Sequence, residues 1–141
     1  MTSKRESIMT YVVNAIETGA TLATGGIFYE RPESVARAET PCILISKIND
    51  SINEANVTYM DRRLSFKVTI VTRGLQPVAA ADPIAIQVYD ALMVDRSLGG
   101  IILELFPAGD NFTVQDGDQP IGILDMLFTA RYRHLATGLD D

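Results

Sequence analysis

The chain has 141 residues, enough for one domain that buries roughly 68% of the surface its unfolded form exposes. Hydrophobic residues make up 47% of the sequence, which excludes an intrinsically disordered chain. There are 12 basic and 18 acidic residues, giving a formal net charge of −6. This acidic balance argues against a free nucleic-acid-binding protein, because such a protein needs basic side chains to neutralise phosphates.

The sequence contains one cysteine, Cys42, so an intramolecular disulfide is excluded and a reducing compartment is indicated. Polar residues such as Asn14 and Glu17 interrupt the opening segment, which therefore lacks the apolar core of a signal peptide. The longest apolar runs have four or five residues, whereas a membrane-spanning helix needs about 20. We expect a single soluble domain over residues 1–141.

The first predicted element is a helix that ends at Gly19. Ser3 stands at its N-cap with Glu6 three residues later, which is the spacing of a capping box. Lys4 and Arg5 in the first turn are unfavourable for the helix dipole, so the start is expected to fray. The apolar residues that recur at helical intervals are Ile8, Val12, Val13 and Ile16.

Three strands are predicted next. Residues 26–31 form a short strand that ends at Pro32, and residues 41–46 form a second strand whose unbroken apolar character indicates burial on both faces. The polar residues 49–58 predict a protruding loop or a hairpin arm. Residues 64–71 alternate between apolar and polar side chains, which predicts a strand with one core face and a start as early as Tyr59.

A second helix is predicted from its capping residues. Asp82 is the expected N-cap, and Pro83 fits the first helical position, where no backbone donor is needed. The segment Leu98-Gly99-Gly100 is expected to lie beyond its end. The buried stripe of this helix is predicted to consist of Ile84, Val88, Ala91 and Leu92.

The last third of the chain reads as two further strands. Residues 101–106 form one strand, with a loop at 109–111 and a possible extension of the ladder at 112–115. After a turn at 116–118, residues 121–134 form a long final strand, and the tail that follows is expected to be mobile. The order helix, strand, strand, strand, helix, strand, strand predicts an α+β fold, in which both helices pack on one face of a mostly antiparallel sheet.

The common catalytic and metal-binding templates find no match. One histidine and one cysteine exclude the usual zinc sites, and no phosphate-binding loop or GxSxG elbow is present. Cys42 and His134 are the one available nucleophile–base pair, but both fall in predicted strands, where Cys42 is expected to act as a core hydrophobe and His134 as a surface residue. Asp116 and Asp118 lack the downstream glutamate of a calcium loop and indicate a turn. We predict no catalytic residue, metal or cofactor.

Arginines gather at the ends of two predicted strands. Arg131 and Arg133 share one face of the last strand, because side chains alternate along it. Arginine suits planar pairing with carboxylates at interfaces, although a solvated strand face remains the alternative. The candidate subunit or partner interface consists of Arg62, Arg63, Arg131 and Arg133 together with Asn53 and Glu54 of the polar arm.

Several of these features follow one another in a recognisable order between Arg5 and about Gly138. They are the opening helix Arg5-x-x-Ile8…Val12…Ile16, the pair Arg31-Pro32, the proline-led strand Pro41-Cys42-Ile43-Leu44-Ile45, a variable polar loop, the alternating strand from Arg63 to Ile70, the passage Asp95-Arg96-Ser97-Leu98-Gly99-Gly100 into Ile101-Ile102-Leu103-Glu104, and Phe128-Thr129-Ala130-Arg131-Tyr132-Arg133. In this order and at this length, the chain resembles the tail terminator proteins of long-tailed phages, the minor tail protein U-like or tail completion family.

The resemblance implies a non-enzymatic structural protein of the virion tail, present in the host cytoplasm during assembly. It implies a hexameric ring that caps the tail tube, stops tube polymerisation and joins the tail to the neck and head. The implied partners are further copies of the chain, the major tail tube protein and a neck or head-completion protein, with no membrane. DNA would pass through the channel without specific binding, and an acidic lining would favour such sliding. Another head–tail connector or neck subunit is the nearest alternative, and a small metabolite-binding protein or enzyme is a remote one.

Replacement of Arg131 or Arg133 by glutamate is expected to weaken assembly while leaving the fold intact, because both side chains share one face of a strand at the candidate interface. Ring formation would be followed by light scattering, and the fold by circular dichroism. Unchanged ring formation by both variants would remove these two residues from the interface.

Overall fold

The computed structural model describes residues 2–31 and 39–139, except for the side chain of Asn53. The described residues form two helices and one five-stranded sheet with strand order β1-β2-β3-β5-β4. The strands pair antiparallel, apart from the parallel pair β1–β2. The α+β class and the predicted order of elements are confirmed. The elements are α1 (Lys4–Gly19), β1 (Ile27–Tyr29), β2 (Cys42–Ala55), β3 (Tyr59–Arg73), α2 (Pro77–Met93), β4 (Glu104–Gln115) and β5 (Ile121–Leu135).

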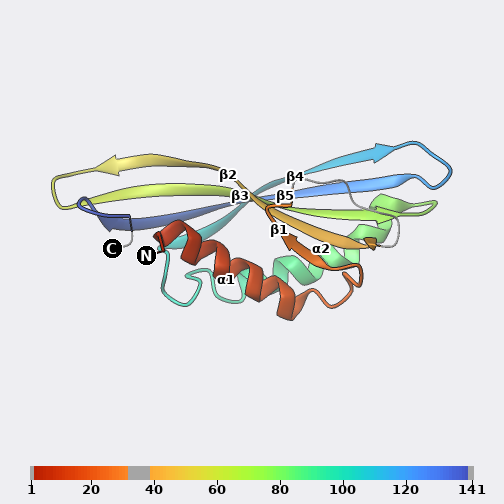
Figure 1. Cartoon of the computed structure of the whole chain (residues 1–141), viewed down its shortest axis with the longest axis horizontal. Coiled ribbons are helices and arrows are strands. Elements are labelled where there is room, and N and C mark those ends of the chain that lie inside the picture. The colour runs from red at the N-terminus through yellow and green to blue at the C-terminus, as the bar shows by residue number, and fades with distance from the viewer. Residues whose placement is uncertain (1, 32–38, 140–141) are drawn as a thin grey trace.

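Both helices cover the same face of the sheet, as predicted (Figure 1). The β2–β3 and β4–β5 hairpins extend past the helices in opposite directions, at the left and right of the view. In β5, buried and half-buried side chains alternate from Ile121 to Tyr132, so the even-numbered residues face the helices. Within the described residues, neither helix is long and apolar enough to cross a membrane.

The core lies between the helices and this inner face of the sheet. Its largest fully buried side chains include Tyr132, Phe66 and Phe128, and the last two stack with their ring centroids 5.5 Å apart. Ile70 and Leu64 complete the inner face of β3 beside them. The helices contribute the residues of their apolar stripes, Ile8, Met9, Val12 and Ile16 from α1 and Ala81, Ile84, Val88 and Leu92 from α2.

Helix α1 begins where its cap predicts. The Ser3 hydroxyl accepts a hydrogen bond from the Glu6 amide at 3.3 Å. The first-turn cations that disfavour the dipole have other partners, since Lys4 donates to the Arg133 carbonyl at 2.7 Å and Arg5 donates to Asp50 at 3.1 Å. The cost of placing positive charge at this helix end is therefore offset by contacts with the sheet.

Helix α2 begins at Pro77, six residues earlier than predicted, with Gln76 at the N-cap. Pro77 occupies the first helical position, which was predicted for Pro83, and Pro83 lies inside the helix. Pro83 and Ala79 are exposed, so the carbonyl that the missing Pro83 donor leaves free can face water. The buried stripe is otherwise as predicted, except that Ala91 is half-buried.

Strand β4 differs from its prediction in two respects, its first residue and the structure of residues 109–111. It begins at Glu104 rather than Ile101, because the Asp95 carboxylate accepts hydrogen bonds from Ser97 and Gly99 and closes a turn before it. The predicted loop at 109–111 is instead paired with β5 through a register shift between Pro107 and Gly109. Gly109 has a φ of +133°, which a glycine adopts without strain. The strand therefore continues through residues 109–111 by forming a bulge instead of ending in a loop.

The polar segment 49–58 is a hairpin arm, which was one of its two predicted forms. Its residues remain in β2 as far as Ala55, and the Asn56 side chain accepts hydrogen bonds from the Thr58 and Tyr59 amides at the turn. The tail predicted to be mobile is hydrogen-bonded as far as Leu139, whose carbonyl accepts from the Lys4 amide at 2.9 Å. Pro32, predicted to end the first strand, lies outside the described residues.

Cys42→Ser is expected to lower the free energy of unfolding by about 1–3 kcal/mol, because it places a hydroxyl at a fully buried position. Burial also raises the pKa of the Cys42 thiol to about 11, so the native thiol should react slowly with alkylating reagents at neutral pH. Thermal melting measures the first effect, with Cys42→Ala as the variant that removes sulfur without adding a polar group. Loss of assembly at an unchanged melting temperature would contradict a purely structural role.

Candidate assembly surface

The arginines of the candidate interface lie where β3 and β5 run side by side near the β2–β3 hairpin. Arg63 pairs with Arg131, and Asp61 pairs with Arg133. Directly paired residues point to the same side of a sheet, so these four side chains share the face opposite the helices, named here the outer face. Arg62 lies on the inner face. The structure therefore brings together Arg63, Arg131 and Arg133 and separates Arg62 from them.

Arg133 is held by groups of its own chain. Its Nε and a terminal nitrogen donate to the two carboxylate oxygens of Asp61 at 2.6 and 3.0 Å, and its guanidinium lies 3.9 Å from the ring centroid of Tyr59. The hydrogen bonds from Arg133 lower the pKa of Asp61, and the charge of Arg131 lowers it further. Asp61 is only 6% exposed, so Arg133→Glu would also remove the partner of a buried carboxylate and lower the stability of the fold.

Arg62 belongs to a polar network on the inner face. Its Nε donates to Nε2 of His134 at 2.8 Å, and its side chain is 16% exposed. His134 is buried rather than on the surface as predicted, and its Nδ1 lies 2.7 Å from the Leu135 carbonyl and 2.9 Å from that of Gly138. Since Nε2 accepts from Arg62, Nδ1 carries the proton and donates to these carbonyls. The network thereby anchors the chain beyond β5.

Asp50 is the centre of this network. The sequence did not predict this role, because Asp50 falls in the polar segment 49–58. One of its oxygens accepts from the Tyr132 hydroxyl at 2.5 Å and from Arg5 at 3.1 Å, and lies 3.6 Å from Arg62. Burial, followed by the hydrogen bond to Asp50, raises the pKa of Tyr132. The other oxygen of Asp50 is buried and has no hydrogen-bond partner among the described residues. The register that pairs Asp50 with Leu64 turns its side chain inward, and only the paired hairpin reveals that.

Arg63 and Arg131 are different, because no hydrogen bond or ion pair of their side chains occurs among the described residues. Arg63 is exposed and Arg131 half-buried, and like charges at directly opposite positions destabilise a sheet. Glu104 is paired with Arg131 on the other side but bonds to Arg96 at 3.0 Å. A hollow of about 280 Å³ beside them is lined by Arg63, Phe106 and Thr129. This arrangement can receive an anionic group.

The remaining two interface candidates lie on the hairpin arm. Glu54 is exposed and pairs with Asp61, so it stands at the border of the outer-face arginines. Asn53 falls at a register shift between Ile52 and Glu54, and its side chain lies outside the described residues.

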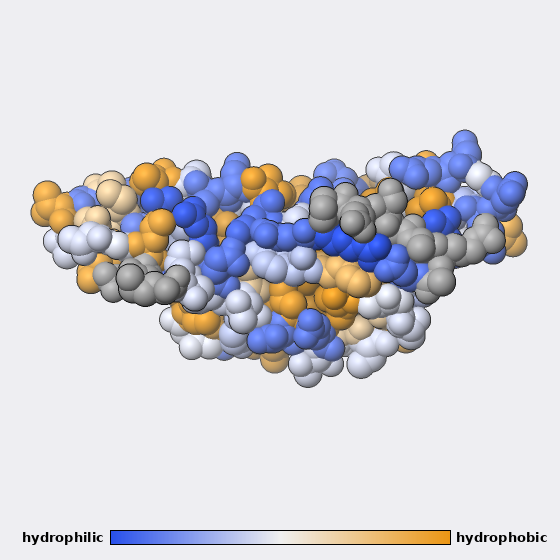
Figure 2. All heavy atoms as spheres, viewed as in Figure 1, coloured by the Kyte–Doolittle hydropathy of each residue, from blue (hydrophilic) through white to orange (hydrophobic). Residues whose placement is uncertain are grey.

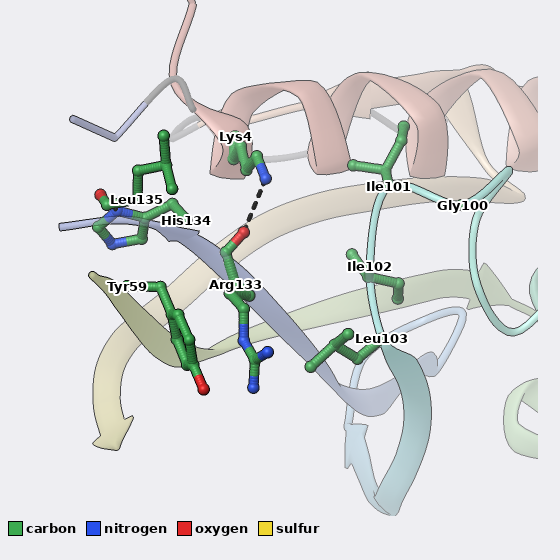
Figure 3. A pocket seen from close by; sticks show the side chains of 9 residues that line it. All are labelled: Lys4, Tyr59, Gly100, Ile101, Ile102, Leu103, Arg133, His134 and Leu135. Atoms are coloured by element: carbon green, nitrogen blue, oxygen red, sulfur yellow. Dashed lines mark hydrogen bonds between the residues drawn. The ribbon is translucent and has the colours of Figure 1, made fainter. Parts of the chain in front are cut away.

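A second cavity, of about 300 Å³, opens where β4 leaves β5 (Figure 3). The Leu103 amide donates a hydrogen bond to the Arg131 carbonyl at 2.8 Å, and residues 100–102 diverge from β5 before this contact. Figure 3 shows the Arg133 guanidinium beside the Tyr59 ring, with Lys4 donating to the Arg133 carbonyl from the other side. The lining offers cationic, aromatic and apolar groups but no serine, threonine or cysteine. The residues that line it are Lys4, Tyr59, Gly100, Ile101, Ile102, Leu103, Arg133, His134 and Leu135.

Cys42 and His134, the one nucleophile–base pair in the sequence, lie at opposite ends of the sheet. Cys42 pairs with Val71 and His134 pairs with Met60, two β3 positions separated by about 36 Å of strand. The pair cannot act together within one chain. Among the described residues, no group of three or more histidine, cysteine, aspartate or glutamate side chains is arranged to hold a metal ion.

No protein-family model matches the sequence, and no curated protein matches it either. Among solved structures, the fold is similar to that of a chain in the virion of a native gene transfer agent particle, with a TM-score of 0.57 and 18% sequence identity. The similarity covers 87% of this chain and 92% of the other. At this identity it shows a shared fold over nearly the whole of both chains.

Asp61→Asn is expected to destabilise the protein in a pH-dependent way, because it removes the charge that pairs with Arg133. The pKa of Asp61 is lowered from its ordinary value of 3.8, so the pair stabilises the fold above that pH and this contribution is lost as the pH falls through the lower folded-state value. The melting-temperature difference from wild type should be constant above about pH 5 and shrink below about pH 4. The exposed Asp82→Asn is the control, and a difference independent of pH would contradict the assignment.

Proposed function

We propose that the chain is a structural protein of a phage-like virion, and that it forms the ring that terminates the tail tube and joins the tail to the neck. The observation that carries the proposal is the fold shared with a gene transfer agent virion chain over 92% of that chain's length. The name of that structure supports a place in a virion. The position at the end of the tail is supported by the ordered sequence features that resemble tail terminators.

The shape of the molecule fits a ring subunit. Ring closure needs a heterologous contact, in which two different surfaces of each copy meet. The two hairpins extend in opposite directions past the helices (Figure 1). They also differ in their charged residues and exposed side chains. Each copy therefore presents two distinct ends to its neighbours, as a closed ring requires.

The sites also fit a structural role better than an enzymatic one. The charged groups of the inner face are used to join α1, β2, β3 and β5, and the lining of the cavity in Figure 3 contains no serine, threonine or cysteine. A metabolite-binding protein would need convergent polar groups in a concave pocket. The proposed subunit interface remains the set given above, with Arg63 and Arg131 now its best candidates because they lack partners in the described part of the chain.

The solution mass across a concentration series, measured by light scattering and followed by negative-stain imaging, tests this proposal. A closed ring of about six subunits, alone or on the ends of tail tubes, is the expected result, because the resemblance implies a hexamer. A protein that remains monomeric at all concentrations and never caps tubes would contradict the function. A ring that binds only portal-like or neck components would assign the chain to a different virion position.

A further inference from the structure

The far end of the β4–β5 hairpin is acidic and exposed. Residues 109–121, named here the acidic tip, contain three aspartates and no lysine or arginine. Every residue of β4 from Pro107 to Gln115 is exposed, including Phe112 at 61% and Val114 at 52%. Hydrophilic side chains gather over this end of the molecule at the right of Figure 2. The aspartates of the acidic tip are Asp110, Asp116 and Asp118.

The outer face carries positive charge near the β2–β3 hairpin, far from the acidic tip. The hollow lined by Arg63, Phe106 and Thr129, with Arg131 paired to Arg63, is named here the arginine hollow. Phe106 gives it an aromatic surface, and the two arginines supply positive charge, with no hydrogen bond or ion pair of their side chains among the described residues. An acidic segment with an exposed aromatic side chain complements both properties.

The acidic tip cannot reach the arginine hollow of its own chain. Arg131 and Ile121 are ten positions apart on the continuous strand β5, which separates them by about 33 Å. Contact between the two surfaces therefore requires two molecules. Because one surface of the first copy meets a different surface of the second, the contact is heterologous and leaves a further tip and a further hollow free.

We propose that the acidic tip of one copy docks in the arginine hollow of the next, and that this contact builds the ring. The inference rests on the proposed ring function and names the surfaces that form it. Asp116 or Asp118 pairs with Arg63 and Arg131 and relieves their mutual repulsion, while Phe112 packs against Phe106. The occupant is a second copy of this chain because the complementary charge is found on the chain itself.

The contact is small. Six residues of strand extend about 20 Å, so two strands of the tip cover much less than the roughly 1,000 Å² that a stable isolated pair needs. The subunits should therefore associate weakly in pairs and gain stability when the ring closes. Association through exposed charges should also weaken as ionic strength rises, because a Debye length is about 10 Å at 0.1 M salt.

Site-directed cross-linking tests the contact directly. Gly117→Cys places a thiol at the tip, where an added Cβ meets only the Gln119 carbonyl at 3.7 Å, and Thr129→Cys places one in the hollow without changing charge. The native Cys42 is fully buried and should not compete. With a short bis-maleimide, a mixture of the two variants should give dimers, and a chain carrying both substitutions should give a ladder of oligomers. The control pairs Gly117→Cys with Asp82→Cys on the exposed face of α2.

Charge-reversal variants test the same contact through the affinity between subunits. Arg63→Glu should weaken association at least about tenfold, because it faces the aspartates of the tip with like charge. Asp116→Arg combined with Asp118→Arg should do the same, and the three changes together should restore part of the loss. Asp82→Arg changes charge at an exposed site on α2, on the opposite side of the sheet from the arginine hollow, and should have no such effect.

The outcomes separate the contact from the proposed function. Cross-linking at the rate of the control pair, or rings that assemble unchanged in the reversed variants, would overturn the contact while the ring function stands. Dimers formed equally well by one variant alone would show a symmetric contact and overturn it too. Absence of any ring, on tubes or in solution, together with control-level cross-linking, would remove both.

Discussion

The pairing of β3 with β5 is the constraint on which the rest of the structure depends. The two strands run antiparallel over 15 consecutive pairs, from Tyr59 with Leu135 to Arg73 with Ile121, without a register shift. An antiparallel pair of this length fixes the face of every side chain along it. It therefore places Phe66 and Phe128 in the core while setting Arg63 opposite Arg131 on the outer face. The neighbouring strands β2 and β4 extend this ladder on either side and carry the bulges instead.

A buried polar network joins the hairpin arm to the body. Asp50 on β2 is reached by Arg5 from α1 and by Tyr132 from β5, so one carboxylate connects three elements far apart in the sequence. Such a network favours one arrangement of the elements when every member has a hydrogen-bond partner. Removal of one partner destabilises the fold, because the remaining charge is then buried without compensation. This network holds Arg62 through His134, and a separate pair with Asp61 on the outer face holds Arg133, so two of the arginines predicted at the interface have partners within the chain.

Charge is separated along the sheet, and that separation gives the molecule a direction. Arg63 and Arg131 stand on the outer face near the β2–β3 hairpin, while residues 109–121 of the opposite hairpin carry three aspartates and no lysine or arginine. The net charge of −6 conceals this arrangement, because the sum does not show where the charges lie. A directional subunit suits assemblies in which each copy contacts the next in the same sense, and steering between opposite charges favours correct encounter.

The sequence by itself determined the elements whose signals are local. Period-two alternation identified β3, helical spacing identified both apolar stripes, and the cap at Ser3 located the start of α1. It misplaced the start of α2, because Pro77 and Pro83 carry the same local signal and only the close packing of Pro77 over Gly122 distinguishes them. It also misjudged residues 109–111, since turn chemistry in a bulge looks like turn chemistry in a loop. Which arginines are free, where His134 lies and what Asp50 joins were decided by register, because pairing between distant strands leaves no periodic trace in the sequence of either one.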